Sequence, residues 1–208
     1  MIIETIEEQY SNTYLVGNEQ DFVIIDPSVD VRNILYIIRK KFPKSKLAAI
    51  ILTHGHYDHF VSIEEVQKNY KVPVYIGKED LSKLTNLNLS CGFFFGLTNL
   101  PKVENVLLLP QELKLGSLNF KIINTPGHTN GSVCIKLENH LFTGDTLFND
   151  GVGRTDLPTG NVVKLNESIK MLMKLDDDLE IYPGHGPSST IGYEKNYNYY
   201  YRYIKNND

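Results

Sequence analysis

The first half of the chain alternates between strand-like and helix-like spacing of apolar residues. Short apolar runs bounded by turn residues predict strands at 14–17, 22–25, 47–52 and 72–76. Between these runs, apolar residues at helical spacing predict one helix that begins near residue 31 and ends before Pro43, and a second helix within 60–70. The run 47–52 is almost entirely apolar, which is typical of a strand covered on both faces.

The second half repeats this plan. Its pattern predicts strands at 113–115, 118–124, 133–137, 141–143 and 179–182, and a helix over 162–175. A carboxyl-terminal helix over 193–203 is expected to bury most of its six tyrosines in the core. No low-complexity linker separates the halves. We therefore predict one domain over 1–208, with halves of about 1–110 and 111–208, sheets inside and helices outside.

Periodicity fails between residues 84 and 100, where polar residues and glycines surround Phe93, Phe94 and Phe95. This pattern predicts a long loop, and such loops inside compact domains are usually functional or mobile. The three phenylalanines either pin the loop onto the core or line the mouth of an apolar pocket, and the pattern leaves both possibilities open.

Composition narrows the choice of partner. A net charge of −4 provides no basic field for a polyanion, so a small molecule is expected and nucleic acid is not. The first residues lack the basic and apolar stretches of a signal peptide, and no apolar run approaches the roughly 20 residues of a membrane span. These features predict a cytoplasmic protein with no membrane partner. Cys91 and Cys134 have no zinc-site spacing and are expected to be buried or incidental thiols.

The strongest chemical signal follows the strand at 47–52, where three of the six histidines and one aspartate lie close together, at His54, His56, Asp58 and His59. In extended or turn backbone, His54 and His56 point to the same side, whereas Asp58 and His59 start the next helix and point elsewhere. One cluster can thus contribute to two metal sites. Zinc binds imidazole nitrogens and carboxylates, and a catalytic zinc keeps one position for water, so further ligands must come from distant sequence.

Three further donors follow apolar strands in the second half: His128, Asp145 and His185. Each has a glycine beside it, which permits the close backbone approach that gathers loops around an ion.

Five motifs together resemble the metallo-beta-lactamase superfamily, and most closely its glyoxalase II-like thioester hydrolases. They are the His54-x-His56-x-Asp58-His59 cluster, Thr125-Pro126-Gly127-His128-Thr129-x-Gly131-Ser132, Gly144-Asp145-Thr146-Leu147-Phe148, Gly153-Arg154-Thr155-Asp156 and Pro183-Gly184-His185-Gly186. The resemblance implies an α/β (α+β) fold, the four-layer αβ/βα sandwich. It also implies that one metal binds His54, His56 and His128, that the other binds Asp58, His59 and His185, and that Asp145 bridges them.

The same resemblance implies an enzyme, a metal-dependent hydrolase with two divalent ions, zinc being preferred and iron or manganese the alternatives. A metal-bound hydroxide is expected to cleave a thioester such as a hydroxyacylglutathione, with Asp58 and Asp145 as catalytic carboxylates. Lactamase branches with this cluster carry a cysteine or a non-ligand in place of Asp145, so antibiotic hydrolysis is not expected. Longer glyoxalase II enzymes bind glutathione with a carboxyl-terminal helical domain. Only 23 residues follow His185, so the chain resembles the short type and its thiol carrier stays open.

Two other functions compete with this one. Persulfide dioxygenases of the superfamily share the 153–156 motif and use one iron on the equivalents of His54, His128 and Asp145, although the Leu157-Pro158 that follows here is more like the short hydrolases. A non-catalytic, metal-stabilised binding protein is the third class. Arg154 and Asp156 are expected to form an ion pair that braces the Asp145 loop, with substrate contact as the alternative. The direction of Tyr57 is not predicted.

Overall fold

The computed structural model describes residues 1–7 and 10–207, and within them the strands form two six-stranded sheets and one small ribbon. The first sheet contains, in spatial order, β1 (Ile2–Ile6), β2 (Thr13–Gly17), β3 (Asp21–Ile25), β4 (Lys46–Ile51), β5 (Val74–Ile76) and β6 (Val106–Leu108). The second contains β14 (Ser189–Thr190), β13 (Glu180–Pro183), β10 (His140–Gly144), β9 (Val133–Leu137), β8 (Leu118–Asn124) and β7 (Glu112–Leu115). The ribbon pairs β11 (Leu147–Phe148) with β12 (Gly151–Val152).

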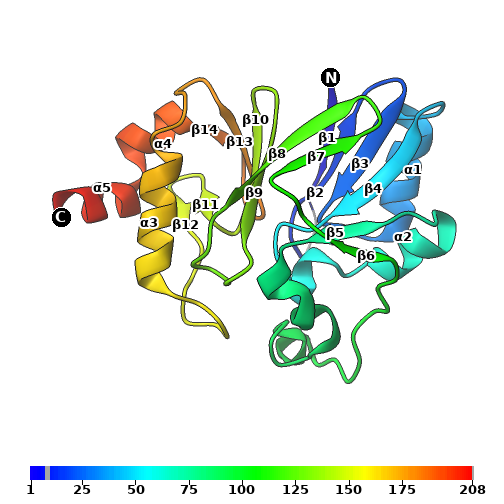
Figure 1. The fold of residues 1–208 in the computed structure, drawn as a ribbon, viewed down its shortest axis with the longest axis horizontal. Helices are drawn as coiled ribbons and strands as arrows, with labels where there is room; N and C mark the ends of the chain where they lie inside the picture. The colour runs from blue at the N-terminus through cyan, green and yellow to red at the C-terminus, as the bar shows by residue number, and fades with distance from the viewer. Residues whose placement is uncertain (8–9, 208) are drawn as a thin grey trace.

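Helices cover the outer face of each sheet, as Figure 1 shows. The first sheet carries α1 (Val31–Lys41) and α2 (Ile63–Asn69), and the second carries α3 (Val162–Leu172), α4 (Ile191–Tyr197) and α5 (Tyr199–Asn206). Short 3₁₀-helices occupy connections: η1 (Tyr57–His59), η2 (Lys78–Thr85) and η3 (Gly92–Phe95). No helix in the described ranges combines the length and apolar composition that a bilayer crossing requires.

Strand alternation explains how these layers stack. Along β3, Phe22 and Ile24 pack under the helices of the first half, whereas Val23 and Ile25 face the second sheet. Successive strand residues point to opposite faces, so a fully apolar strand supplies two cores at once. A third core lies between the second sheet and α3 to α5, with Leu165 and Ile181 among its members. Three cores between four layers confirm the predicted αβ/βα sandwich.

Several local predictions were wrong. The sequence pattern missed the edge strands β1, β6 and β14, and the supposed loop at 84–100 contains η3. The expected carboxyl-terminal helix is two helices, because the side chain of Asn198 accepts the backbone N–H of Tyr201 and begins α5. These short helices lie on the surface with few inward positions. Most of their tyrosines are therefore exposed rather than buried: Tyr193, Tyr197, Tyr199 and Tyr203.

Candidate metal centre

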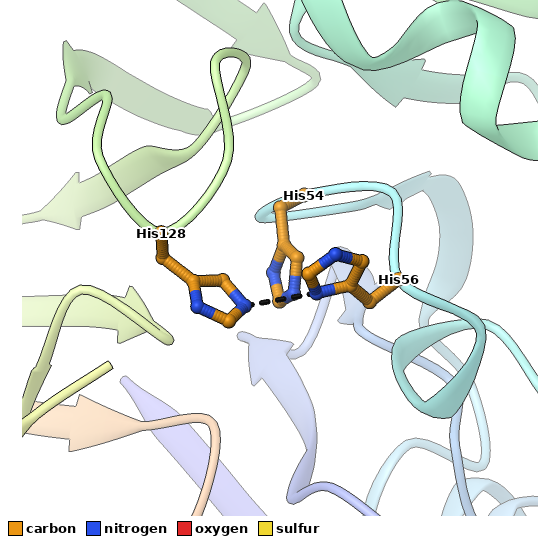
Figure 2. Close-up of side chains that lie close together, drawn as sticks. All are labelled: His54, His56 and His128. Atoms are coloured by element: carbon orange, nitrogen blue, oxygen red, sulfur yellow. Dashed lines mark hydrogen bonds between the residues drawn. The ribbon is translucent and has the colours of Figure 1, made fainter. Parts of the chain in front are cut away.

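The seven predicted donors lie together where strands from both sheets end. The loop after β4 carries His54 to His59, the β8–β9 connection carries His128, and Asp145 and His185 follow β10 and β13. Their ligand atoms form three overlapping groups, each with its atoms within 4.8 Å of one another: His54, His56 and His128; His54, His59 and Asp145; and Asp58, His59 and His185. Figure 2 shows the first group, in which the imidazoles of His54, His56 and His128 converge.

Asp145 lies between the two predicted triads. One of its oxygens, Oδ1, is 3.2 Å from His59 Nε2, and the other, Oδ2, is 3.5 Å from both His128 Nε2 and His185 Nε2. Burial opposes a charge on Asp145, but His59, His185 and His128 together hold the pKa of its carboxyl well below the usual value. The carboxylate is therefore ionised and has an oxygen toward each triad, as a bridging ligand requires.

Hydrogen bonds outside the donor set fix the orientation of three imidazoles. His59 donates Nδ1–H to Asp26 Oδ2 at 2.8 Å, and His128 donates Nδ1–H to the Arg154 carbonyl at 2.8 Å. Thr53 Oγ1 donates to Asp26, which leaves that hydroxyl to accept Nδ1–H of His54 at 3.1 Å. Nδ1 of each of these rings is therefore engaged by a neighbour and Nε2 is turned toward the centre, the orientation by which proteins prepare histidine for a metal.

Several donor atoms lie close together and lack hydrogen-bond partners, as expected for a site that binds a cation. Nδ1 of His56 lies 2.9 Å from His128 Nε2, and burial together with the nearby imidazole lowers the pKa of His56 to about 3. Buried atoms without a hydrogen-bond partner in the described chain include the Nε2 atoms of His54, His56 and His59 and Oδ1 of Asp145. Asp145, Asp26 and Asp58 outweigh burial and raise the pKa of His59 well above its usual value, so this space favours positive charge. Converging imidazoles and carboxylates with unpartnered buried atoms fit divalent metal ions.

One position beside a donor has no room for a side chain and therefore requires glycine. At Gly184, next to His185, an added Cβ would lie 2.2 Å from Asp145 Oδ1 and 2.7 Å from His59 Cε1. Asn12 of the first half holds this loop, because its Nδ2 donates to the carbonyls of Pro183 and Gly186. The position of His185 thus depends on residues far apart in sequence.

Asp80, which the sequence pattern did not single out, ties two donor loops together. Its buried carboxylate accepts the N–H of Gly55 at 2.8 Å, the N–H of Gly131 at 3.0 Å and the hydroxyl of Thr129 at 2.7 Å. Gly55 lies between His54 and His56, and Thr129 follows His128. Asp80 therefore fixes the spacing between these donor loops.

A cavity of about 520 Å³ opens above the donors. Its lining includes the donors His56, Asp58, His128, Asp145 and His185, together with Cys91, Phe94, Phe95, Phe148, Val152, Arg154 and Leu157. The predicted ion pair is present, with both N···O distances from Arg154 to Asp156 at 2.6 Å. Tyr57 is buried against Phe60 and Phe95 and belongs to the core of the first half. Cys91 and Cys134 are free and buried, as expected.

The sandwich and its convergent histidines and carboxylates define a metal-binding protein with its centre at the strand ends. The Metallo-beta-lactamase superfamily model matches residues 6–185, and the chain belongs to this superfamily of metal-dependent hydrolases. A probable metallo-hydrolase of Streptococcus pyogenes is 39% identical over 90% of this chain and 84% of its own length. The hydroxyacylglutathione hydrolase GloC of Haemophilus influenzae is 34% identical over 95% of both chains. The crystal structure of the BLEG-1 B3 metallo-beta-lactamase matches with a TM-score of 0.89 and 29% identity, covering 96% of this chain and 99% of that one.

Proposed function

We propose that this chain hydrolyses thioesters at a centre of two divalent metal ions. The observation that carries the proposal is the position of Asp145, whose two oxygens face histidines of both triads. One ion would be held by His54, His56 and His128, the other by Asp58, His59 and His185, with Asp145 shared. Similarity to a hydroxyacylglutathione hydrolase over 95% of both chains supports a thioester as the substrate class.

Ions bound there would acidify a coordinated water and stabilise negative charge on the substrate carbonyl oxygen. The protein's own groups account for orientation and proton movement. Asp58 lines the cavity with its side chain 19% exposed, which supports a role in receiving the proton of the attacking water. A C–O bond forms, the C–S bond breaks, and the proton passes to the departing thiolate, giving an acid and a thiol. Thiolates leave readily and require little help from a general acid.

Metal analysis combined with two activity assays tests this proposal. The purified protein is expected to contain two divalent ions per chain and to release thiol from a hydroxyacylglutathione. One iron per chain with oxygen consumption on glutathione persulfide would instead identify a dioxygenase that uses His54, His128 and Asp145. Metal binding without either activity would indicate a binding protein.

A further inference from the structure

The three phenylalanines of the central loop differ in what they contact. Phe95 is anchored, with its ring centroid 5.2 Å from that of Tyr57 and 5.7 Å from that of Tyr10. Phe94 lines the cavity above the metal donors and yet leaves 64% of its surface exposed. Phe93 contacts Phe94 with the two rings tilted and their centroids 4.0 Å apart, but it is not part of the lining. Phe95 thus holds the loop in place, and the exposed ring of Phe94 forms an apolar wall of the cavity.

A second wall of the cavity is also apolar. Phe148 and Val152, on the β11–β12 ribbon of the second half, and Leu157 line the same cavity as Phe94 and Phe95 of the first half. The ring centroid of Phe148 is 6.0 Å from that of His185. The cavity therefore offers an apolar group hydrocarbon from both halves of the chain, beside the metal donors.

Charge in the cavity argues against recognition of a substrate carboxylate. Among the described lining residues, the one lysine or arginine is Arg154, and its guanidinium is held in two hydrogen bonds by Asp156. Glutathione carries two carboxylates, and this lining offers them no unpaired cation.

A buried lysine joins the two walls. Lys83 is 1% exposed, and its Nζ donates to the carbonyl of Leu89, before the phenylalanine loop, at 3.0 Å and to that of Pro158, after Leu157, at 3.3 Å. Burial lowers the pKa of this ammonium group. These bonds link the segment before the phenylalanine loop to the segment after Leu157, which favours an apolar space that exists before the ligand binds.

We propose that these walls bind the apolar acyl chain of a thioester substrate, so that the centre selects acyl chains longer than acetyl by contact with Phe94, Phe148 and Val152. The inference rests on the proposed thioester hydrolysis. It assigns specificity to the acyl half of the substrate and leaves the thiol carrier largely unrecognised.

A chain-length series on one neutral carrier tests the assignment. With acetyl, butyryl, hexanoyl and octanoyl thioesters of N-acetylcysteamine, kcat/KM is expected to rise by up to about 4-fold per methylene, the factor equivalent to ~0.8 kcal/mol of burial. Phe94→Ala should reduce this factor by at least half. Phe93→Ala, on the same loop but outside the lining, is the matched control. A flat wild-type series, or equal losses in both variants, would overturn the proposal.

A binding measurement separates this inference from the proposed reaction. Ketone analogues, in which methylene replaces the ester sulfur, cannot be hydrolysed, and calorimetry on the metal-loaded protein gives their dissociation constants. Affinity is expected to rise with acyl length in the wild type and much less in Phe94→Ala. Length-dependent ketone binding without hydrolysis of any thioester would support the apolar site and refute the proposed reaction. Binding independent of length would refute the apolar site whatever the activity.

Discussion

Replacing Asp80 with alanine should weaken both the fold and the metal centre. The change removes the acceptor for the N–H groups of Gly55 and Gly131 and the hydroxyl of Thr129, all in buried surroundings. Each buried donor left without a partner costs ~1–3 kcal/mol. A water entering the vacated space would satisfy some of these donors, and the cost of burying the carboxylate charge disappears. We therefore expect unfolding free energy to fall by about 4 kcal/mol, within the sum of the three costs.

Two measurements separate the effects. Urea denaturation in the presence of a chelator reports the fold alone, and competition with a chromophoric chelator reports zinc affinity. We expect zinc affinity to fall roughly 10- to 100-fold, the range for residues that orient ligands from outside the coordination shell. Asp80→Asn should be intermediate, since one amide oxygen can still accept but the NH₂ group faces other donors.

Glu79→Ala is the matched control, because this exposed neighbour lies on the same η2 helix and makes none of the three hydrogen bonds of Asp80 to the donor loops. Its effect should stay within about 0.5 kcal/mol, as for most surface changes. Equal effects of Asp80→Ala and Glu79→Ala on both the unfolding free energy and the zinc affinity would refute the role assigned to Asp80.

Three further predictions concern single residues. Asp145→Ala should weaken the binding of both ions, so mass spectrometry of the native protein should find neither ion at wild-type occupancy. The variant Glu112→Ala, at an exposed position, should keep both ions. Full retention of one ion in Asp145→Ala would contradict the bridging role. Gly184→Ala should displace the Asp145 carboxylate, because its Cβ would lie 2.2 Å from Oδ1, and should lower zinc affinity by at least 10-fold on the scale of lost ligand orientation. Burial raises the pKa of Cys134 to about 12, so its thiolate fraction is negligible at pH 8 and a disulfide reagent should label it only after unfolding; rapid native labelling would show that this thiol is accessible.

The donor set could be predicted from sequence because its signals are local. A histidine or aspartate beside a glycine, directly after an apolar strand, can be recognised without knowing what lies opposite, as at His128 and His185. The structure brings these donors together, and their assignment as ligands of two ions stays a prediction. The sandwich itself follows from apolar strands that supply two cores, as β3 does.

The supporting residues could not be predicted in this way. Asp26 follows the predicted strand at 22–25 and precedes Pro27, where nothing local indicates a supporting role, yet its carboxylate accepts hydrogen bonds from Thr53 and His59, which are 27 and 33 residues away. Asp80 and Lys83 belong to a short amphipathic segment whose inward partners are likewise distant. Such roles depend on which distant loops the fold brings together, and the local spacing of residues does not predict these contacts.

The carboxyl-terminal tyrosines show another limit. Aromatic residues at close spacing suggested a buried helix face, but Asn198 divides the segment and turns α5 outward. The phenylalanine loop had two open interpretations. Both hold in part, since Phe95 packs on Tyr57 while Phe94 lines the cavity.

The spread of the donors along the chain sets an order of events during synthesis. The first four donors leave the ribosome within residues 54–59, but the donor set is complete only when His185 has been made and Asn12 has captured its loop. A nascent first half therefore offers an incomplete set of ligands. We expect tight metal binding to follow the docking of the two sheets, so that only chains that have finished folding carry tightly bound metal.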